Sequence, residues 1–599
     1  MKEYKNRLIT ASIILVLAFL IIAIRMWYMQ ILKGDEFEKF STNNRISVTR
    51  FPAPRGRILD RRGRELAINR SSFDVYVVPN DITSIDAVSN ILSPTLGIKP
   101  IIISEKITKA HKENRFKPTL IADDINRDQL AFIEARRINL TGVLIHVDHR
   151  RTYPYGKFAA SLLGYLGRAD KDDFKLNPNL IGTKLVGKNG VEKTLETFLR
   201  GEDGFSQRII DAYGREIKSN FLERDLKNQD SVPGSDIFLT IDLDLQRIAE
   251  ETLGERSGAI VAFDVRTGEV LALVSHPNFD PEFFIHGFDQ KKWNNLIKDK
   301  SFPLLNRVTQ GLYAPGSVFK IVTAAAALKE GVIDEHTRFY CPGSYRLGKS
   351  RFRCWKKGGH GSLNLHQAIV RSCDVFFYNL AERLGISRFA NYIKGFGFGS
   401  PTGIDLNERP GVAPSIEWKL KNLKQRWYTG ETVVTGIGQG YINVTPLQIA
   451  VMTASIANGG ILLKPQVLKK VVSQNGEIVL ETNPEEKGRT PVGEEITREI
   501  MNALVGVVNE PGGTGGAARL DGVIVAGKTG TAQVISLDSK ITSHELNDHA
   551  WFTSYAPGDT PEIAVTVLVE HGGKGGAIAA PIAKEIIKAY MKLKEEGNV

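Results

Sequence analysis

The sequence predicts an α+β fold that is attached to a membrane by one N-terminal helix. Strand-like segments occur at 257–275 and again between 522 and 570, and the chain between them is mostly helical in pattern. Strands at both ends of such a region, with helices between them, favour one antiparallel sheet of five strands covered by helices. At 599 residues the chain is too long for one ordinary hydrophobic core, so we expect several domains.

The membrane anchor is predicted at residues 8–30. The run from Leu8 to Ile24 is apolar apart from two hydroxyl side chains. At ~1.5 Å per residue it is slightly shorter than the ~30 Å hydrocarbon core, and a helix continued through Trp27 and Tyr28 closes this gap with interfacial aromatics. A cleaved signal peptide is the alternative, but no small-x-small cleavage site follows the apolar run.

The charges before the anchor predict its orientation. Residues 1–7 carry three basic side chains and one acidic side chain, so this short tail is expected in the cytoplasm. The protein is then a single-pass protein of the cytoplasmic (inner) membrane, with the bulk of the chain in the periplasm.

The composition is that of a globular protein with an excess of positive charge. Hydrophobic residues make up 42% of the sequence and charged residues 24%, and the formal net charge is +11. We find no basic run with interleaved aromatics, so no nucleic-acid partner is predicted. The charge instead favours a solvated basic face near anionic lipid or an anionic polymer.

A polar, turn-rich stretch predicts the boundary between two large domains at residue 235. It reads DLKNQDSVPGSD and covers 225–236. The first domain, 31–235, has a mixed pattern. Its elements are predicted as an extended segment at 47–67 and helical stretches near 83–93 and 127–136. The second domain, 236–599, contains the predicted five-stranded sheet.

Ser317 and Lys320 lie at the start of a predicted helix, in YAPGSVFKIVTAAAAL. Residues i and i+3 share a helix face, so the Lys320 amine is within reach of the Ser317 hydroxyl. A serine needs a neighbour to take its proton, and a lysine does so only when its surroundings lower its pKa from ~10.4 toward neutrality. The helix N-terminus would favour a developing oxyanion. The alternative is an N-cap serine followed by a solvated lysine.

A second candidate group is the strand-like segment Gly527-Lys528-Thr529-Gly530-Thr531. Its two glycines would leave backbone room for a ligand chain beside the strand. Lys528 would offer charge to a carboxylate, Thr529 a hydroxyl and Thr531 a backbone N–H. The alternative is an exposed edge strand that its lysine protects from edge-to-edge pairing.

Ser372, Cys373 and Asp374 form the third group, in LHQAIVRSCDVFFYNLAERLG. This trio could be only a turn or a helix cap, or it could present one hydroxyl and one carboxylate to a shared cleft. In chain order the three groups match the S-x-x-K, S-D-N and K-T-G set of β-lactamases and penicillin-binding proteins, with S-x-D in the middle. The acylation base is disputed across that set, and Lys320 is the candidate base here.

Nearly the whole chain resembles a class B penicillin-binding protein. Motifs similar to those of the non-catalytic pedestal domain of that class are RGRILDRRG at 55–63, RRTYPYG at 150–156 and GKNGVEKTLETFLRG at 187–201. Segments similar to its transpeptidase domain are GAIVAFDVRTGEVLALVSHPNFDP, LNRVTQGLYAPGSVFK, TGIGQGYINVTPLQIA and AGKTGTAQ. S-x-D and CPGSYRLGKSRFRCWKKGGHG resemble the elongation type, and the division type is the alternative.

This resemblance implies both a fold and a reaction. The fold is a β-lactamase/transpeptidase-like domain on an elongated mixed α/β pedestal. The reaction is D,D-transpeptidation of peptidoglycan, in which Ser317 attacks the penultimate carbonyl of a stem peptide ending in D-Ala-D-Ala. D-Ala would leave, and an amine of a neighbouring stem would resolve the acyl-enzyme. Backbone N–H groups of Ser317 and Thr531 would form the oxyanion hole.

The resemblance also implies roles for the remaining site residues. Ser372 would relay a proton with Lys320, while Lys528 and Thr529 would hold the terminal carboxylate. Asp374 departs from the commoner Asn, which puts its role as a neutral hydrogen-bonding group in doubt. β-Lactam antibiotics would acylate the same serine as mimics of the D-Ala-D-Ala end.

A structural zinc ion is implied beside these motifs. Its ligands would be Cys341, Cys354, His360 and Cys373, which include every cysteine of the chain. A Cys3His set can satisfy tetrahedral zinc with no open position. The alternative in an oxidising compartment is a Cys341–Cys354 disulfide with Cys373 as a buried thiol, and His366 is a weaker alternative ligand.

The resemblance implies partners as well. No glycosyltransferase domain is recognisable in the first 235 residues, which favours a RodA-type glycan polymerase and other elongation-complex membrane proteins as partners. The pedestal would contact the polymerase and gate the cleft. Two other functions were weighed: a hydrolase (D,D-carboxypeptidase or β-lactamase), which is not expected to carry a long pedestal, and a β-lactam sensor, which is expected to carry a cytoplasmic signalling part.

Overall fold

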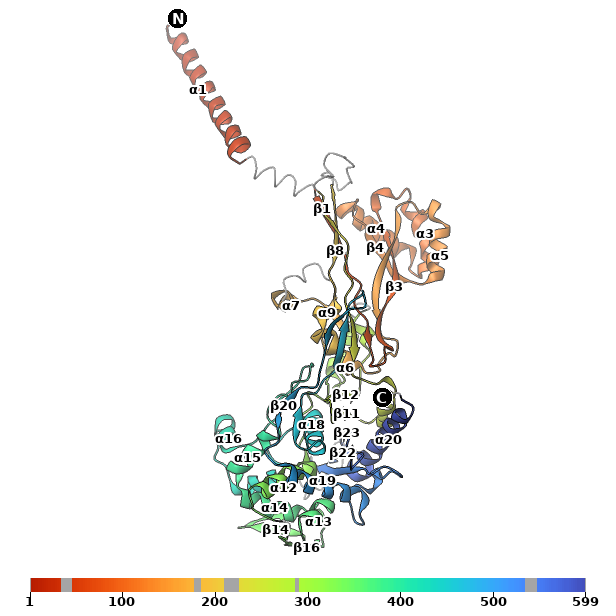
Figure 1. Ribbon diagram of the computed structural model, residues 1–599. Coiled ribbons are helices and arrows are strands. Elements are labelled where there is room, and N and C mark those ends of the chain that lie inside the picture. The colour runs from red at the N-terminus through yellow and green to blue at the C-terminus, as the bar shows by residue number, and fades with distance from the viewer. Residues whose placement is uncertain are drawn as a thin grey trace. The chain divides into compact units, whose positions relative to one another are not determined.

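The computed structural model describes residues 2–33, 46–176, 185–209, 226–285, 290–334, 336–533 and 547–597 (Figure 1). The chain folds into two compact units. Unit 1 contains Met1–Pro54, Asn69–Arg150 and Glu202–Val232, and unit 2 contains Arg55–Ile68, Arg151–Gly201 and Pro233–Val599. Two segments that precede residue 235 therefore pack within unit 2. The predicted functional division at residue 235 stays a prediction.

The predicted anchor is one long apolar helix. α1 (Lys2–Trp27) continues into a π-helical turn, η1 (Tyr28–Leu32). The stretch Tyr4–Leu32 has a mean hydropathy of 2.7, and its apolar side chains are exposed. Its length and composition suit a membrane span.

Unit 1 contains strands covered by three helices. β3 (Glu65–Val77) pairs with β4 (Thr119–Ile125) and β5 (Val143–Thr152). The apolar faces of these strands share a core with the helices, which are α3 (Ile85–Leu96), α4 (Pro100–Asn114) and α5 (Arg127–Ala135). α3 and α5 occupy the two predicted helical stretches. A separate sheet joins β1 (Ile46–Phe51), β8 (Gly204–Ile209) and β9 (Asn228–Gln229).

Unit 2 contains the predicted five-stranded sheet. Its order is β12 (Val270–His276), β11 (Gly258–Asp264), β23 (Ile563–Val569), β22 (His549–Ala556) and β21 (Ala526–Ala532), and every neighbouring pair is antiparallel. β11 and β23 are buried along their whole length, which requires cover on both faces. The prediction of one antiparallel sheet is confirmed.

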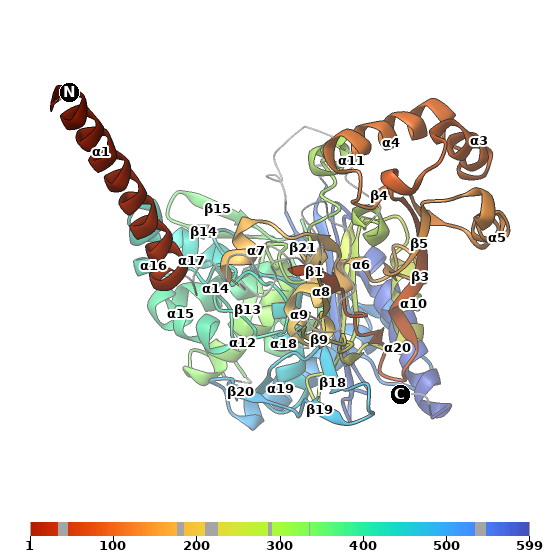
Figure 2. The ribbon, with the colours of Figure 1, turned by 90° about the horizontal axis from the view of Figure 1, so that it is seen from above.

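Helices supply that cover. α10 (Leu243–Leu253) and α20 (Gly575–Glu595) lie side by side and share a core with one face of the sheet (Figure 2). α18 (Pro446–Ala457) and α19 (Glu494–Asn509) pack with the other face, where α12 (Lys320–Lys329) also contributes to the core. Every residue of α18 is buried, as expected for a helix that is apolar on all sides.

The motifs at 55–63, 150–156 and 187–201 meet at one buried carboxylate in unit 2. Glu192 is fully buried and accepts hydrogen bonds from Arg55 at 2.6 Å, from Arg151 at 2.7 Å and from the Tyr153 hydroxyl at 3.2 Å. A buried charge is strongly unfavourable unless it is paired in this way. The pairing explains why segments far apart in the sequence pack as one body.

Two short two-stranded sheets precede the Ser372-Cys373-Asp374 group. β13 (Phe339–Cys341) pairs with β16 (Gly361–Leu363), and β14 (Ser344–Leu347) pairs with β15 (Ser350–Arg353). α13 (Leu365–Val370) and α14 (Asp374–Leu384) then flank Ser372. This arrangement brings the segment between β13 and α14 beside the site described next.

Candidate active site and an adjoining cysteine–histidine cluster

Ser317 lies in a tight turn against the edge strand of the sheet. The 3-10 turn η7 (Gly316–Phe319) leads directly into α12 and packs on β21. Gly316 has a φ of +56° and donates its N–H to Gly438 O at 2.9 Å, and a Cβ on Gly316 would approach Thr531 O to 2.8 Å. Only glycine fits there. Ser317 is half-buried and does not cap either helical segment.

Lys320 is a fully buried amine in the first turn of α12. It donates to Ser372 O at 2.9 Å, to Ser372 Oγ at 3.2 Å and to Asp374 Oδ1 at 2.7 Å. Its Nζ also lies 5.3 Å from the centre of the Phe377 ring. The alternative of a solvated lysine is therefore wrong.

Ser372 is held in an uncommon backbone conformation between α13 and α14. Its φ is +52°, a left-handed value that costs a non-glycine residue on the order of 1 kcal/mol. The strain places both its carbonyl and its hydroxyl toward Lys320. Asp374 opens α14, and its carboxylate lies beside the same amine. Asp374 thus forms an ion pair where the commoner Asn would form a neutral hydrogen bond.

Lys528 brings a second buried amine to the same hydroxyl. It donates to Ser372 Oγ at 2.9 Å and to Thr529 O at 3.1 Å. Burial lowers the pKa of Lys528 well below its usual value, the nearby charge of Lys320 lowers it further, and Asp374 only partly offsets these effects. The site therefore joins two amines and one carboxylate around Ser372.

The rest of the Gly527–Thr531 group packs closely against the protein. The Thr529 hydroxyl lies 2.8 Å from that of Thr514. A Cβ on Gly527 would meet Phe552 at 2.7 Å, and one on Gly530 would meet Trp551 at 2.9 Å and Val318 at 3.0 Å. These glycines thus allow close packing against the protein on their Cβ side, and the prediction that they leave room for a ligand chain beside the strand stays a prediction.

Trp355 is a site residue that the sequence reasoning missed. Its backbone N–H donates to Asp374 Oδ2 at 2.9 Å, and its indole Nε1 donates to Ser372 O at 3.0 Å. More than half of the side chain is exposed. The available signal was its place directly after Cys354. A metal ligand at Cys354 that lies beside the Ser372-Cys373-Asp374 group also brings Trp355 close to that group.

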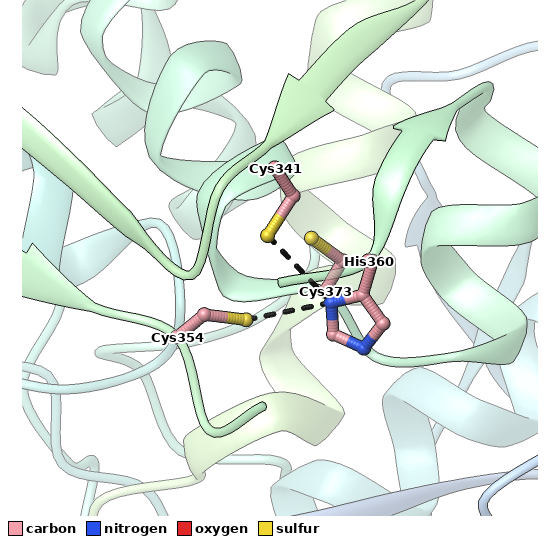
Figure 3. Close-up of side chains that lie close together, drawn as sticks. All are labelled: Cys341, Cys354, His360 and Cys373. Atoms are coloured by element: carbon pink, nitrogen blue, oxygen red, sulfur yellow. Dashed lines mark hydrogen bonds between the residues drawn. The ribbon is translucent and has the colours of Figure 1, made fainter. Parts of the chain in front are cut away.

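The four predicted metal ligands form one cluster (Figure 3). One ligand atom from each of Cys341, Cys354, His360 and Cys373 lies within 4.8 Å of the other three. The cysteines are free thiols, so the structure contains no Cys341–Cys354 disulfide. His366 lies elsewhere, with Nε2 at 2.7 Å from Glu510 Oε1.

The cluster geometry fits a tetrahedral metal. His360 Nδ1 lies 3.7 Å from Cys341 Sγ and 3.6 Å from Cys354 Sγ. Tetrahedral zinc with Zn–S of ~2.3 Å and Zn–N of ~2.1 Å separates sulfur and nitrogen by ~3.6 Å. Within the cluster, the hydrogen bond between Cys373 and Cys354 lowers the pKa of the Cys354 thiol and raises the pKa of the Cys373 thiol, and burial raises the pKa of the Cys341 thiol.

Comparisons with known proteins place this site in a family. Residues 258–588 match the penicillin-binding protein transpeptidase domain, and residues 50–239 match the penicillin-binding protein dimerisation domain. The peptidoglycan D,D-transpeptidase MrdA of Acinetobacter baumannii is 36% identical, with 100% of this chain and 89% of the relative covered. The MrdA protein of Escherichia coli K12 is 34% identical, with 96% and 92% covered.

Solved structures agree with these matches. The penicillin-binding protein 2 (PBP2) of Helicobacter pylori, in a complex with MreC, is 30% identical, with a TM-score of 0.77, and 92% of this chain and 99% of that chain are covered. PBP2 of Pseudomonas aeruginosa in complex with WCK 5153 is 32% identical, with a TM-score of 0.68 and coverages of 91% and 96%.

These matches show that the chain belongs to the class B penicillin-binding proteins. Within that family it is of the elongation type, the PBP2 group, as the S-x-D motif and the cysteine-containing segment predicted.

Replacing Lys528 with Met should stabilise the fold while removing a site residue. Because the pKa of Lys528 is lowered in the folded state, the unfolded chain binds more protons between that pKa and ~10.4, and stability rises with pH in this window. At pH 7, Lys528→Met should therefore raise the unfolding free energy by ~1–2 kcal/mol. Urea unfolding at pH 7 and pH 9 should show this gain shrinking as pH rises.

The matched control is Lys588→Met on the exposed face of α20, which should change the unfolding free energy by less than ~0.5 kcal/mol at either pH. A destabilised Lys528→Met variant, or a gain that does not depend on pH, would contradict the assignment of a neutral buried amine.

Proposed function

We propose that this protein is a peptidoglycan D,D-transpeptidase of cell-wall elongation, that Ser317 is its nucleophile and that β-lactams acylate the same serine. The supporting observation is the convergence of three motifs that are distant in sequence. The Ser317 turn packs on β21, and the amines of Lys320 and Lys528 both contact Ser372 Oγ. The MrdA relatives named above support the same reaction.

The proposed proton route begins with Lys320 as an ammonium. Lys320 donates to three acceptors, which is the full donor capacity of a charged lysine. Burial lowers the pKa of Lys528 well below its usual value, so the proposed route begins with Lys528 as the neutral amine. In this resting arrangement Lys320 cannot accept the Ser317 proton, so a proton must first move.

Substrate binding supplies the reason for that move. A terminal D-Ala carboxylate bound beside Lys528 and Thr529 would favour the ammonium form of Lys528. One proton then passes from Lys320 to Ser372 Oγ while the Ser372 hydroxyl proton passes to Lys528, over contacts of 3.2 and 2.9 Å. Lys320 is left neutral and takes the Ser317 proton as the serine attacks the carbonyl.

The backbone around Ser317 completes the proposed site. β21 is the last strand in the sheet order, so among the described strands one of its edges has no partner. An extended stem peptide can pair with such an edge. Its scissile carbonyl would then lie near the N–H groups of Ser317 and Thr531, which would stabilise the oxyanion. Gly530 allows β21 to approach the serine turn this closely.

We further infer that Cys341, Cys354, His360 and Cys373 hold one structural zinc ion. The sulfur–nitrogen separations support this, because they match those of tetrahedral zinc. An ion bound by all four ligands would have no open position and would serve structure only. It would hold Cys354 and Cys373, which adjoin Trp355, Ser372 and Asp374.

The cellular setting follows from the same proposal. α1 would anchor the protein in the cytoplasmic membrane, with the bulk of the chain, including the pedestal at 31–235 and the transpeptidase domain at 236–599, in the periplasm. A RodA-type glycan polymerase would supply strands for cross-linking. Support comes from the H. pylori complex with MreC and from a structure described as coordinating polymerization and crosslinking in a peptidoglycan synthase complex, which is 29% identical with a TM-score of 0.72.

Ser317→Ala should abolish covalent labelling by a fluorescent penicillin, because it removes the hydroxyl proposed to be acylated. Labelling of the detergent-solubilised full chain, resolved on a denaturing gel, measures this directly. Ser387→Ala, an exposed serine on α15 (Ile386–Gly395), is the control and should label normally. Persistent labelling of Ser317→Ala would remove the proposed nucleophile.

Metal analysis should find about one zinc per chain in the wild type. His360→Ala should lose the metal and unfold at a lower temperature, because structural zinc contributes directly to folding. His366→Ala should retain the metal, because His366 contacts Glu510 instead. Zinc near zero in the wild type, or equal loss in both variants, would refute this site.

Trp355→Phe should slow penicillin acylation about three- to tenfold, because it removes the indole N–H bond to Ser372 O and keeps an apolar ring. Trp427→Phe removes an indole bond to Thr432 elsewhere in the unit and should leave the rate unchanged. Stopped-flow acylation measures both. A role in folding alone would lower the melting temperature of Trp355→Phe while its acylation rate stayed at the wild-type value.

A further inference from the structure

The segment from 338 to 357 presents an all-basic surface beside the site. It contains seven lysines and arginines and no acidic residue, and all seven are exposed. They are Arg338, Arg346, Lys349, Arg351, Arg353, Lys356 and Lys357. Aromatic residues are interleaved with them. This is a basic run with interleaved aromatics, and the statement that the sequence contains none was wrong.

The hairpin of β14 and β15 separates these residue types onto two faces. Tyr345 and Phe352 pack against Tyr378 of α14, with ring centres at 6.1 and 5.7 Å. Alternation along each strand then turns the intervening arginines outward. Arg346 lies directly opposite Arg351 in the cross-strand register. We call this outward surface the arginine face; it consists of Arg346, Arg351 and Arg353.

The arginine face is electrostatically unfavourable as it stands. Like charges directly opposite each other across a hairpin are destabilising. Arg351 donates to Ser344 Oγ at 3.0 Å, and within the described residues neither Arg346 nor Arg351 forms an ion pair. Protection of a strand edge does not explain the pattern, because charges of either sign would serve that purpose. A bound anion relieves the repulsion.

Hydrogen bonds connect the strand that carries the arginine face to α14, Ser372 and Asp374. The Tyr378 hydroxyl donates to Arg353 O at 3.1 Å, and two residues later Trp355 donates to Ser372 and Asp374. At ~3.3 Å per residue, the backbone of Arg351 is at most ~13 Å from that of Trp355. A five-residue peptide in extended form spans ~17 Å, so one peptide can reach from the arginine face to the residues around Trp355, whose hydrogen bonds hold Ser372 and Asp374.

We propose that the arginine face binds the carboxylates of the acceptor stem peptide, the strand whose amine resolves the acyl-enzyme. This inference rests on the proposed transpeptidase function. In that reaction the donor's terminal carboxylate departs with D-Ala, whereas the acceptor arrives with its own carboxylates intact. Guanidinium groups match carboxylates in a two-pronged geometry. The exposed arginines therefore attract and orient the second substrate.

The test compares acceptor use with acylation in the full-length protein. Arg346→Gln/Arg351→Gln should raise the KM for a synthetic stem-peptide acceptor about fivefold, as expected for the loss of two exposed ion pairs of ~0.5 kcal/mol each. The KM for the same acceptor with its carboxylates amidated should already be high in the wild type and should not change. Penicillin acylation should match the wild type, because it needs no acceptor.

Lys588→Gln/Lys592→Gln is the charge-matched control on α20, across the sheet from the site, and it should change none of these values. An unchanged acceptor KM in the arginine variant, or an equal change for the amidated acceptor or in the lysine variant, would overturn the proposal. Loss of binding to anionic phospholipid vesicles with an unchanged acceptor KM would assign the face to a membrane instead, and would also overturn it.

The outcomes separate this inference from the proposed function. A wild-type protein that is not acylated by penicillin would refute the function itself, and the acceptor proposal with it. Normal acylation with an unchanged acceptor KM would refute only the acceptor proposal. Misfolding is not expected in the arginine variant, because it removes a repulsive pair, and its melting temperature checks this.

Discussion

The site depends on the balance of charge around one hydroxyl. Ser372 Oγ contacts two buried amines, and a single carboxylate, that of Asp374, lies beside one of them. Two buried ammonium groups with one carboxylate would leave an unpaired positive charge in a low-dielectric interior, which is costly. The balance is met if one lysine is neutral, and burial together with the charge of Lys320 lowers the pKa of Lys528 well below its usual value.

Rigid elements on both sides hold this balance in place. On one side β21 fixes Lys528 within a buried antiparallel sheet, and the glycines of that strand let it approach the Ser317 turn. On the other side, the left-handed Ser372 is stabilised by Trp355 and by the start of α14. Strained residues persist where the surrounding structure over-determines them. Ser372 meets that condition because neighbours from distant parts of the chain contact both its carbonyl and its hydroxyl.

The features that could be predicted from the sequence depend on local spacing, on periodic patterns or on motifs that resemble a known family. The helix-turn spacing of Ser317 and Lys320, the five strands and the four-ligand cluster could all be found from pattern or resemblance. Trp355 was missed because its importance comes from two hydrogen bonds that only the folded chain creates. The packing of residues 55–68 and 151–201 into unit 2 depends on Glu192, whose arginine partners lie up to 137 residues away in sequence. No local pattern encodes a pairing of that range.

The segment between β13 and α14 has little core of its own, and this limits how it can be ordered. Its strands form only two-stranded sheets, which are marginal in isolation. It is held by the Tyr345 and Phe352 contacts with α14 and by the cysteine–histidine cluster. Trp355 and the arginine face lie between those two supports. The hydrogen bonds that orient Ser372 and the surface proposed for the acceptor are therefore carried by the same segment and the same supports.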